Sequence, residues 1–252
     1  MKNILIIGAN GFTGRRILND LSVNPIYHVT GCSLRDDICP GKDYRFVRTD
    51  IRDENEVRKL FKECRPDIVI NTSALSVPDY CETHHAEAEA TNVTAVETIA
   101  HVCEQYGSRF IHLSTDFVFD GKSTRLYKEE DEAIPVNYYG VTKLKAEKII
   151  ASICSNYAIV RVVVVYGKAL PGQHGNILQL VANRLRNGET IRVVSDQWRT
   201  PTFVGDISVG VEKLMFHTAN GIYHICGSEC LTIAEIAYRV ADFLKLDRSL
   251  IE

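Results

Sequence analysis

Short apolar runs alternate with longer amphipathic stretches through the first two thirds of the chain. The short runs are typical of buried β-strands, and we predict strands at residues 3–7, 27–33, 44–47, 67–71, 109–113 and 158–165. Apolar residues at helical spacing predict helices between them, at residues 12–21, 53–64, 87–105 and 138–153. In the last of these helices, we expect a buried apolar stripe formed by Val141, Ile149, Ile150 and Ile153. This alternation indicates an α/β fold with a doubly wound parallel sheet, covered by helices on both faces.

The pattern changes near residue 167. Glycine and proline become more frequent, the elements shorten, and polar loops carry Trp198 and Arg199. We therefore predict a sheet domain over residues 1–166 and a smaller lobe, mainly for substrate binding, over residues 167–252. The sequence stops shortly after a helical stretch without a clear terminating signal, so we expect that it lacks a natural C-terminal tail.

Composition and charge narrow the class of protein. The chain has 252 residues, of which 45% are apolar and 24% are charged, as in an ordinary soluble globular protein. Its 29 basic and 32 acidic side chains give a net charge of −3, so no positive excess attracts nucleic acid or an anionic membrane. No apolar run approaches the ~20 residues that span a bilayer. We predict a cytoplasmic protein that binds neither nucleic acid nor membranes.

The eight cysteines indicate reduced, buried thiols rather than a disulfide framework. None of them form a C-x-x-C pair, and most fall inside apolar segments. Cys226 and Cys230 are the closest pair, and His224 is near, but it alternates with Cys226 along a predicted strand. A zinc site would need further ligands at suitable spacing, so we predict no metal.

A glycine-rich turn joins the first predicted strand to the first predicted helix, with the sequence Gly8-Ala9-Asn10-Gly11-Phe12-Thr13-Gly14. The first glycine allows a tight turn, the second lets the backbone approach a pyrophosphate, and the third lets the helix pack close to the sheet. The helix N-terminus presents free N–H groups and the positive end of its dipole to phosphates. In this strand–turn–helix setting, the glycines predict a dinucleotide-binding Rossmann domain over residues 1–166.

The end of the second predicted strand bears on the choice of dinucleotide. An acidic residue there would bind the ribose 2′-hydroxyl of NAD(H) and repel the 2′-phosphate of NADP(H). This chain has Ser33 and Arg35, which suit a phosphate, and no carboxylate before Asp36. The sequence therefore favours NADP(H). The carboxylates of Asp36 and Asp37, and the alternative that Arg35 is only a solvated loop residue, leave NAD(H) open.

Tyr139 and Lys143 lie four residues apart in a predicted helix and therefore on one face of it. A nearby ammonium lowers the pKa of a tyrosine from about 10 toward working pH, so the phenol can serve as a general acid or base. Upstream, Ser114 and Thr115 end a buried strand, and the carboxyl ends of parallel strands border the ligand cleft of such a sheet. We expect both hydroxyls at this cleft; the alternative for Thr115 is a helix or turn cap.

Several segments together resemble the extended short-chain dehydrogenase/reductase superfamily. They are the glycine turn, Asn71-Thr72-Ser73-Ala74, the run Ser114-Thr115-Asp116-Phe117-Val118-Phe119-Asp120-Gly121, and Tyr139-x-x-x-Lys143-Leu-x-Ala-Glu147. The run from Ser114 is the most specific and resembles the dTDP-4-dehydrorhamnose reductase family, as does the segment 196–202 near Asp206. The resemblance covers essentially the whole chain.

The resemblance implies hydride transfer from NADPH to the C4 keto group of a nucleotide-linked deoxysugar. It implies that Tyr139 protonates the developing alkoxide, that Lys143 binds the nicotinamide ribose and lowers the tyrosine pKa, and that Thr115 hydrogen-bonds the carbonyl oxygen. The implied cofactor contacts are Gly8, Asn10, Gly11, Phe12, Thr13, Gly14, Ser33, Arg35, Asp50, Ile51, Ser73, Ala74, Leu75, Ser114, Tyr139 and Lys143. The implied substrate contacts are Val77, Asp116, Phe117, Trp198 and Arg199.

Two positions depart from the family pattern. The family often has a tyrosine where this chain has Phe117, and a tryptophan in the segment that here spans residues 161–167. Both family aromatics lie near the sugar, so their absence puts the identity of the sugar in doubt. Related dehydratases usually carry an Asp-Glu pair after the threonine, and related NAD-dependent epimerases an acidic residue after the second strand. Because this chain has neither, both activities remain weaker alternatives.

A different class of protein is also similar. The regulatory β subunit of methionine adenosyltransferase shares the fold, an S-D-Y-V-F-D-G-like run, the tyrosine–lysine pair and a segment much like residues 29–35. That protein acts chiefly as a binding partner, so the tyrosine–lysine pair alone does not imply turnover. In many relatives, the helices that correspond to residues 87–105 and 138–153 pair two protomers, so the resemblance allows a homodimer.

Overall fold

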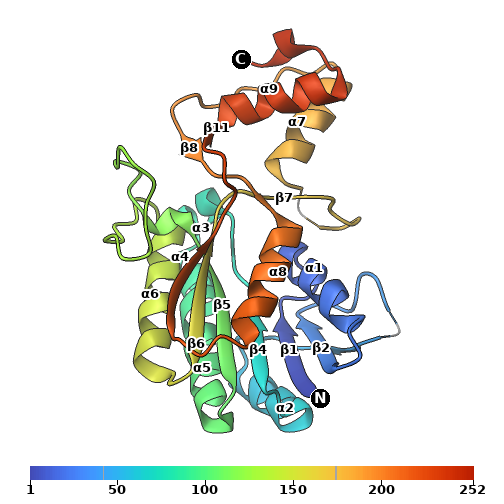
Figure 1. Ribbon diagram of the computed structural model, residues 1–252, viewed down its shortest axis with the longest axis vertical. Coiled ribbons are helices and arrows are strands. Elements are labelled where there is room, and N and C mark those ends of the chain that lie inside the picture. Colours follow the sequence, from blue (N-terminus) through green and yellow to red (C-terminus); the bar gives the residue numbers. More distant parts are fainter. Residues whose placement is uncertain (42, 174) are drawn as a thin grey trace.

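The sheet at the centre of the molecule has seven strands in the order β10-β6-β5-β4-β1-β2-β3, and all neighbouring pairs are parallel. The computed structural model describes residues 1–41, 43–173 and 175–252 (Figure 1). The strands are β1 (Lys2–Ile7), β2 (Tyr27–Ser33), β3 (Arg45–Arg48), β4 (Ile68–Asn71), β5 (Arg109–Thr115), β6 (Tyr157–Val162) and β10 (Gly221–Ile225). The predicted doubly wound parallel sheet is confirmed, with one strand more than the six that the hydrophobic pattern indicated.

Helices cover both faces of the sheet (Figure 1). One face carries α1 (Phe12–Ser22) and α8 (Val204–Met215), and the other carries α2 (Glu54–Cys64), α5 (Ala95–Tyr106) and α6 (Tyr138–Ile153). Because successive side chains of a strand point to opposite faces, each strand feeds both layers. In β1, Ile4 and Ile6 join one core cluster, and Leu5 and Ile7 join the other.

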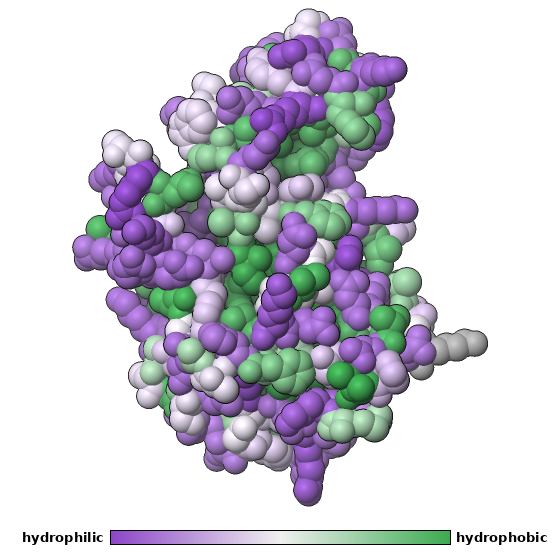
Figure 2. Space-filling model, viewed as in Figure 1, coloured by the Kyte–Doolittle hydropathy of each residue, from purple (hydrophilic) through white to green (hydrophobic). Residues whose placement is uncertain are grey.

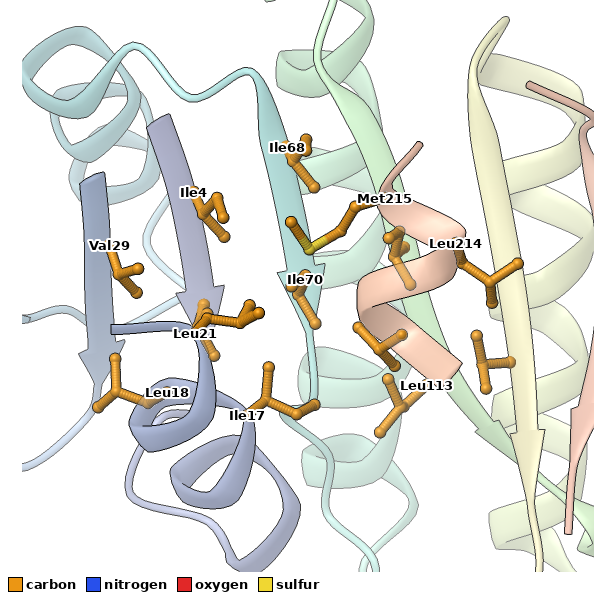
Figure 3. Close-up of a cluster of buried hydrophobic side chains, with 14 of the residues drawn as sticks. Ile4, Ile17, Leu18, Leu21, Val29, Ile68, Ile70, Leu113, Leu214 and Met215 are labelled. Atoms are coloured by element: carbon orange, nitrogen blue, oxygen red, sulfur yellow. The ribbon is translucent and has the colours of Figure 1, made fainter. Parts of the chain in front are cut away.

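Figure 3 shows the first of these clusters. Isoleucines of β1 and β4 meet Ile17, Leu18 and Leu21 from α1, and Leu214 and Met215 from α8 lie against the same surface. All five of these helix residues are at most 8% exposed. Burial of such a side chain stabilises the fold by roughly 1.5–3 kcal/mol, so this layer fixes α1, and with it the glycine turn, against the sheet.

The remaining helices of the larger part are short or irregular. They are α3 (Pro78–Thr83), α4 (His85–Glu89), the π-helical turn η1 (Ala90–Thr94) and the 3-10 turn η2 (Asp116–Val118). The helix predicted at residues 87–105 therefore consists of α4, η1 and α5. π-helical turns of this kind are frequent at functional sites, and this one carries the fully buried Asn92.

The smaller lobe has its own core. It contains α7 (Ile177–Arg186), α9 (Ile233–Leu244), the 3-10 turn η3 (Arg248–Leu250) and the antiparallel pair β8 (Trp198–Arg199) with β11 (Leu231–Thr232). Its buried side chains come mainly from α7 and α9. The short parallel pair β7 (Val165–Tyr166) with β9 (Thr202–Phe203) lies where the chain crosses between the two parts.

Residues after 167 do not all belong to the lobe. The helix α8 packs against α1, and β10 pairs with β6 at the edge of the sheet (Figure 1). The expected boundary at residue 167 therefore does not separate the sheet from the lobe, because residues 204–225 return to the sheet. Figure 2 shows apolar side chains at the surface where the two parts meet. A groove of about 1120 Å³ lies there, lined in part by Phe203, Leu231, Ile236 and Phe243.

Within the described ranges, no helix has the length and apolar character that a membrane crossing requires. The same residues contain no cluster of three or more potential metal ligands. The cysteines are all free thiols, but the expectation that they are buried holds only in part. Cys32, Cys81, Cys103 and Cys154 are buried and Cys64 is half-buried, whereas Cys39, Cys226 and Cys230 are exposed because they lie in loops.

Candidate active site

The glycine turn leaves no room for side chains at two of its positions. Gly8 has a φ of +82°, and a Cβ there would lie 2.7 Å from the backbone nitrogen of Ser73. A Cβ on Gly14 would lie 2.4 Å from the carbonyl oxygen of Gly8. The helix α1 has Gly11 at its N-cap position and no side-chain cap, so its first N–H groups remain available to an external acceptor. This cradle fits a pyrophosphate group.

The first test of the cradle is Gly14→Ala. The added Cβ pushes the first turn of α1 away from β1, so we expect NADPH affinity to fall at least about tenfold, or 1.4 kcal/mol. We also expect the free energy of unfolding to fall by about 1–3 kcal/mol. Fluorescence titration with NADPH and urea unfolding measure the two effects. Gly175→Ala is the matched control, because its Cβ would meet only ordinary contacts, the nearest at 3.4 Å. Equal NADPH affinity in both variants would contradict a phosphate cradle at Gly14.

The side chain of Asn10, in the glycine turn, forms hydrogen bonds with the backbone of the loop after β2. Its Nδ2 donates to the backbone carbonyls of Arg35 at 3.1 Å and Asp36 at 2.8 Å, and its Oδ1 accepts from the backbone N–H of Ile38 at 3.2 Å. The predicted contact residues Ser33 and Arg35 therefore lie next to the turn, at the end of β2.

Two arginines near this loop have different environments. Arg15 is 2% exposed and forms a buried ion pair with Asp37, and its guanidinium also donates to Tyr44 Oη at 2.9 Å. Arg35 is exposed, and its guanidinium has no ion-pair or hydrogen-bond partner among the described residues. Because the charge of Arg15 is already paired with Asp37, Arg35 is the better candidate to meet a phosphate.

The segment after β4 is held from both ends. Asn71 Oδ1 accepts from the backbone N–H of Ser73 at 3.0 Å and from its Oγ at 2.6 Å. At the other end, Asn92 Oδ1 accepts from the backbone N–H of Leu75 at 2.8 Å, and Asn92 Nδ2 donates to Leu75 O at 3.1 Å. The predicted contacts Ser73, Ala74 and Leu75 therefore form a fixed edge next to Gly8. Asp50 and Ile51 are both half-buried and follow β3, the edge strand that pairs with β2.

Thr115 and Tyr139 meet at the carboxyl end of β5. Thr115 Oγ1 caps the 3-10 turn η2 by accepting from the N–H of Phe117 at 3.2 Å. The capping alternative for Thr115 is therefore observed. Its hydroxyl donates to Asp116 Oδ1 at 3.3 Å and lies close enough to the Tyr139 phenol to lower the pKa of that phenol. Tyr139, near the start of α6, is buried and packs edge-on against Phe117 with ring centroids 5.8 Å apart. The two predicted catalytic hydroxyls thus lie together.

The expected lowering of the tyrosine pKa is wrong for this arrangement. Burial raises the pKa of Tyr139 above its ordinary value, and the negative charge of Asp116 raises it further, against a smaller lowering by the Thr115 hydrogen bond. Lys143 Nζ donates to Leu113 O at 2.7 Å and contacts His112 Nε2 at 2.8 Å. Tyr139 is therefore held as a neutral phenol, the form that can donate a proton.

Ser114 differs from the prediction. Its side chain is buried, and its hydroxyl donates to Glu147 on α6 instead of facing the cleft. Glu147 also accepts from Arg161 on β6, through Nε at 3.0 Å and Nη2 at 2.7 Å. The side chains of both members of this ion pair are 3% exposed. Ser114 therefore belongs to a buried polar network that joins α6 to the sheet, next to Thr115.

Arg199, on β8 of the smaller lobe, contacts two residues of the candidate site. Its Nε lies 3.4 Å from Asp116 Oδ2, and its guanidinium lies over the ring of Phe117 at 5.5 Å from the centroid. Burial raises the pKa of Asp116, and the positive charge of Arg199 opposes this shift. Trp198 and Val77 are 59% and 46% exposed, so their surfaces are open to a ligand. The structure thus brings Arg199 to Asp116 and Phe117, at the entrance to Tyr139.

Sequence reasoning missed the roles of four polar residues around the site. His112, Asn92 and the ion pair of Arg161 with Glu147 are buried and hydrogen-bonded to site segments. The sequence did contain a signal for them. Each is a polar or charged residue at a position that the periodicity of its strand or helix assigns to the protein core. Such residues are almost never fully buried without a partner, and the partner comes from another element, which no local pattern identifies.

The fold and this site define the class. A parallel sheet with a glycine turn after β1, and a tyrosine and lysine four residues apart on α6 beside the carboxyl end of β5, are the features of an extended short-chain dehydrogenase/reductase. A family model described as the RmlD substrate binding domain matches residues 1–252. The chain belongs to this family of sugar-nucleotide reductase-like proteins.

Its relatives include reductases and a subunit of methionine adenosyltransferase 2. The chain is 31% identical to the probable low-salt glycan biosynthesis reductase Agl14 of Haloferax volcanii, over 98% of this chain and 82% of that protein. It is also 31% identical to the methionine adenosyltransferase 2 subunit beta of Xenopus laevis, over 98% of this chain and 74% of that protein. A solved dTDP-4-dehydrorhamnose reductase from Bacillus anthracis, in complex with NADP, superposes with a TM-score of 0.85 at 26% identity. That match covers 98% of this chain and 82% of the other.

Proposed function

We propose that this protein catalyses the NADPH-dependent reduction of the C4 keto group of a nucleotide-linked deoxysugar. The observation that supports the proposal most is that Thr115 and the buried phenol of Tyr139 lie together at the carboxyl end of β5, at the same edge of the parallel sheet as the glycine turn after β1. A carbonyl reduction needs a cofactor site, a proton donor and a group that polarises the carbonyl oxygen. The chain places candidates for all three at one edge of the sheet.

The roles of the residues follow from their contacts. Tyr139 donates its proton to the carbonyl oxygen as negative charge develops there, and Thr115 stabilises that oxygen with a hydrogen bond. Lys143 lies one helical turn from Tyr139 and would hold the nicotinamide ribose. The cofactor, when bound, supplies the hydride. Asp116, Phe117 and Arg199 close the entrance and orient the sugar, while exposed Trp198 and Val77 contact the rest of the substrate.

NADP(H) is the proposed cofactor, with NAD(H) as the weaker alternative. Arg35 supports this choice, because it is exposed at the end of β2 without a partner among the described residues. We expect Arg35→Ala to weaken NADPH binding by about ten- to a hundredfold, since a hydrogen bond to a charged group contributes about 1.5–3 kcal/mol. NADH binding should change little. Fluorescence titration with each cofactor measures the difference.

Arg58→Ala controls for the loss of a surface arginine, because Arg58 lies on α2 and pairs with Glu54. We expect it to bind both cofactors as the unmodified protein does. Equal weakening of NADPH and NADH by Arg35→Ala would remove Arg35 from the 2′-phosphate site. Tighter binding of NADH than NADPH by the unmodified chain would overturn the choice of NADP(H).

The direct assay is the loss of NADPH absorbance with dTDP-4-keto-6-deoxy-L-mannose as the substrate. Turnover supports the proposed reaction with its sugar. Turnover only with another nucleotide-linked keto sugar would keep the reaction and change the substrate, which the Phe117 position leaves open. Tight NADPH binding without turnover on any keto sugar would contradict the reductase.

A second candidate is an NADP-binding regulatory subunit. It is favoured by the 31% identity to the methionine adenosyltransferase 2 subunit beta of Xenopus laevis. The expected result for this function is a stable complex with a methionine adenosyltransferase catalytic subunit on size-exclusion chromatography, and a changed activity of that subunit. Turnover of a keto sugar without complex formation would exclude it. A homodimer is part of neither test and remains an expectation from the resemblance.

A further inference from the structure

One ion pair joins the smaller lobe to the candidate site. Arg199 lies on β8 of the lobe, and Asp116 lies in the 3-10 turn η2 after β5, so the pair crosses between the two parts of the molecule. The side chains of Arg199 and Asp116 are 23% and 17% exposed, and the guanidinium also covers the ring of Phe117. This contact therefore covers the entrance to the buried phenol of Tyr139.

The polar contacts of the Arg199 guanidinium are long. Its Nε lies 3.4 Å from Asp116 Oδ2, Nη1 donates to Trp198 O at 3.3 Å, and Nη2 donates to Gln197 Oε1 at 3.4 Å. Hydrogen bonds between a guanidinium and a negatively charged oxygen are usually about 2.7–2.9 Å long. A diphosphate carries two negative charges and can accept paired short bonds from the planar guanidinium. A diphosphate that enters here can therefore draw Arg199 away from Asp116.

The charge of Asp116 depends on Arg199. Burial raises the pKa of Asp116, and the positive charge of Arg199 is the largest opposing effect, ahead of the hydrogen bond from Thr115 Oγ1 at 3.3 Å. Among the described residues, the phenol of Tyr139 on α6 also faces Asp116 and is neutral, and Cys81 on α3 acts on that phenol. A carboxylate that loses its cation where water has little access binds a proton more readily.

We propose that binding of a nucleotide-linked sugar transfers Arg199 from Asp116 to the diphosphate, and that Asp116 then takes up one proton. The proton comes from water or buffer and stays on the carboxyl group while the ligand is bound, and no covalent bond to the ligand forms or breaks. The inference rests on the proposed function for the nature of the ligand. The dependence of Asp116 on Arg199 is a property of the chain itself and is independent of turnover.

A protonated Asp116 changes the site in two ways. Its carboxyl group can donate a hydrogen bond to a sugar oxygen, which a carboxylate cannot do. It also loses the negative charge that raises the pKa of Tyr139, so this pKa falls while the ligand is bound. Tyr139 is then a stronger acid, and it gives up its proton more readily, only when the sugar that receives the proton is in place.

The proposal determines how ligand binding depends on pH. Because Asp116 holds a proton more tightly in the complex than in the unliganded protein, binding takes up protons at pH values between its two pKa values. The affinity for the sugar nucleotide is therefore highest at low pH and decreases as the pH rises through this interval. The diphosphate of a sugar nucleotide is a diester and stays fully ionised there, so it contributes no proton of its own.

Nuclear magnetic resonance tests the dependence of Asp116 on Arg199 without a ligand. Spectra of the full chain with ¹³C-labelled aspartate carboxyl groups follow the titration of each side chain, and comparison with Asp116→Asn assigns the signal. We expect the pKa of Asp116 to rise by about 1 pH unit or more in Arg199→Gln, because the opposing cation is removed. Arg239→Gln is the matched control, since Arg239 lies on α9 of the same lobe and pairs with Glu229. An unchanged pKa of Asp116 in Arg199→Gln would overturn the proposal.

Calorimetry tests the uptake of a proton on binding. The ligand is dTDP-6-deoxy-L-mannose, the reduced form of the keto sugar, which binds without turnover. Its heat of binding is measured at one pH in two non-phosphate buffers with different enthalpies of ionisation, and the difference gives the number of protons taken up. We expect net uptake of up to one proton per ligand. The affinity should be at least about tenfold higher at low pH than at high pH, which corresponds to a change of one unit in the pKa of Asp116.

Two variants distinguish Asp116 from other carboxylates in the calorimetry. Asp116→Asn should bind the ligand without proton uptake, because an amide does not titrate. Asp120→Asn should retain the uptake, since Asp120 lies in the same segment but accepts from Tyr127 Oη at 2.7 Å, away from Arg199. Binding without proton uptake by the unmodified chain, or uptake that persists in Asp116→Asn, would overturn the proposal. Failure of the sugar nucleotide to bind at all would contradict the proposed function, and this result is distinct from binding without proton uptake.

Discussion

Replacing Tyr139 with phenylalanine is expected to lower kcat for NADPH-dependent reduction by about 10²–10⁴-fold, the usual contribution of a positioned proton donor. The ring keeps its edge-on contact with Phe117, because only the hydroxyl is removed. Stability and NADPH affinity should therefore change little. Steady-state kinetics with a nucleotide-linked keto sugar and fluorescence titration with NADPH measure the two quantities.

The neighbouring tyrosine provides a matched control. Tyr138 is the preceding residue of α6, and its hydroxyl donates to Glu89 at 2.8 Å, outside the site. Tyr138→Phe removes the same atom from the same helix turn, and we expect it to retain most of the activity. A similar loss in both variants would show that Tyr139→Phe acts through the helix rather than through proton transfer.

The largest effect on stability is expected for Glu147→Ala. This change leaves the guanidinium of Arg161 buried without its carboxylate, and it removes the acceptor of the Ser114 hydroxyl. Breaking a buried pair by removing one partner costs about 3–5 kcal/mol. The cost is high because Arg161 Nη1 already has no hydrogen-bond partner among the described residues, so no spare acceptor is at hand. Urea unfolding followed by circular dichroism measures the change.

Lys145→Ala is the control for this experiment, because Lys145 lies on α6 as Glu147 does, and its ion pair with Glu89 of α4 is exposed. The side chain of Lys145 is 48% exposed, and such pairs contribute at most about 1 kcal/mol. A double variant, Glu147→Leu with Arg161→Met, should recover much of the lost stability, since apolar side chains can replace a buried pair. A loss below about 1 kcal/mol in Glu147→Ala would mean that Arg161 finds water or another acceptor.

The helix α6 shows where the hydrophobic pattern stops being informative. The pattern gave the correct helix bounds, but Val141, Ile149 and Ile153, expected in the core, are only half-buried. The face against the sheet instead buries Thr142, Lys143, Ala146, Glu147 and Ile150. Polar side chains lie inside because His112 and Arg161, on β5 and β6, supply their partners. A pattern that treats every charged residue as exposed cannot predict this face.

The sequence by itself determined the features that depend on local order. Strand and helix periods fixed the sheet and its layers, and the glycines of the turn marked a backbone position with φ of +82° at Gly8. The spacing of Tyr139 and Lys143 fixed their common helix. Each of these follows from residues within a few positions of one another, where backbone geometry alone relates spacing to direction.

Only the tertiary structure decided the contacts between distant segments. In the folded chain, β10 pairs with β6 in the sheet, Arg199 lies beside Asp116, and the Ser114 hydroxyl donates to Glu147. The tertiary structure also buried Tyr139 beside Asp116 and directed Lys143 Nζ to His112, so burial and the Asp116 charge raise the tyrosine pKa where the spacing predicted a fall. The physical reason is that a buried polar group takes whichever partner the packing of other elements places within reach, and sequence spacing carries no information about that partner.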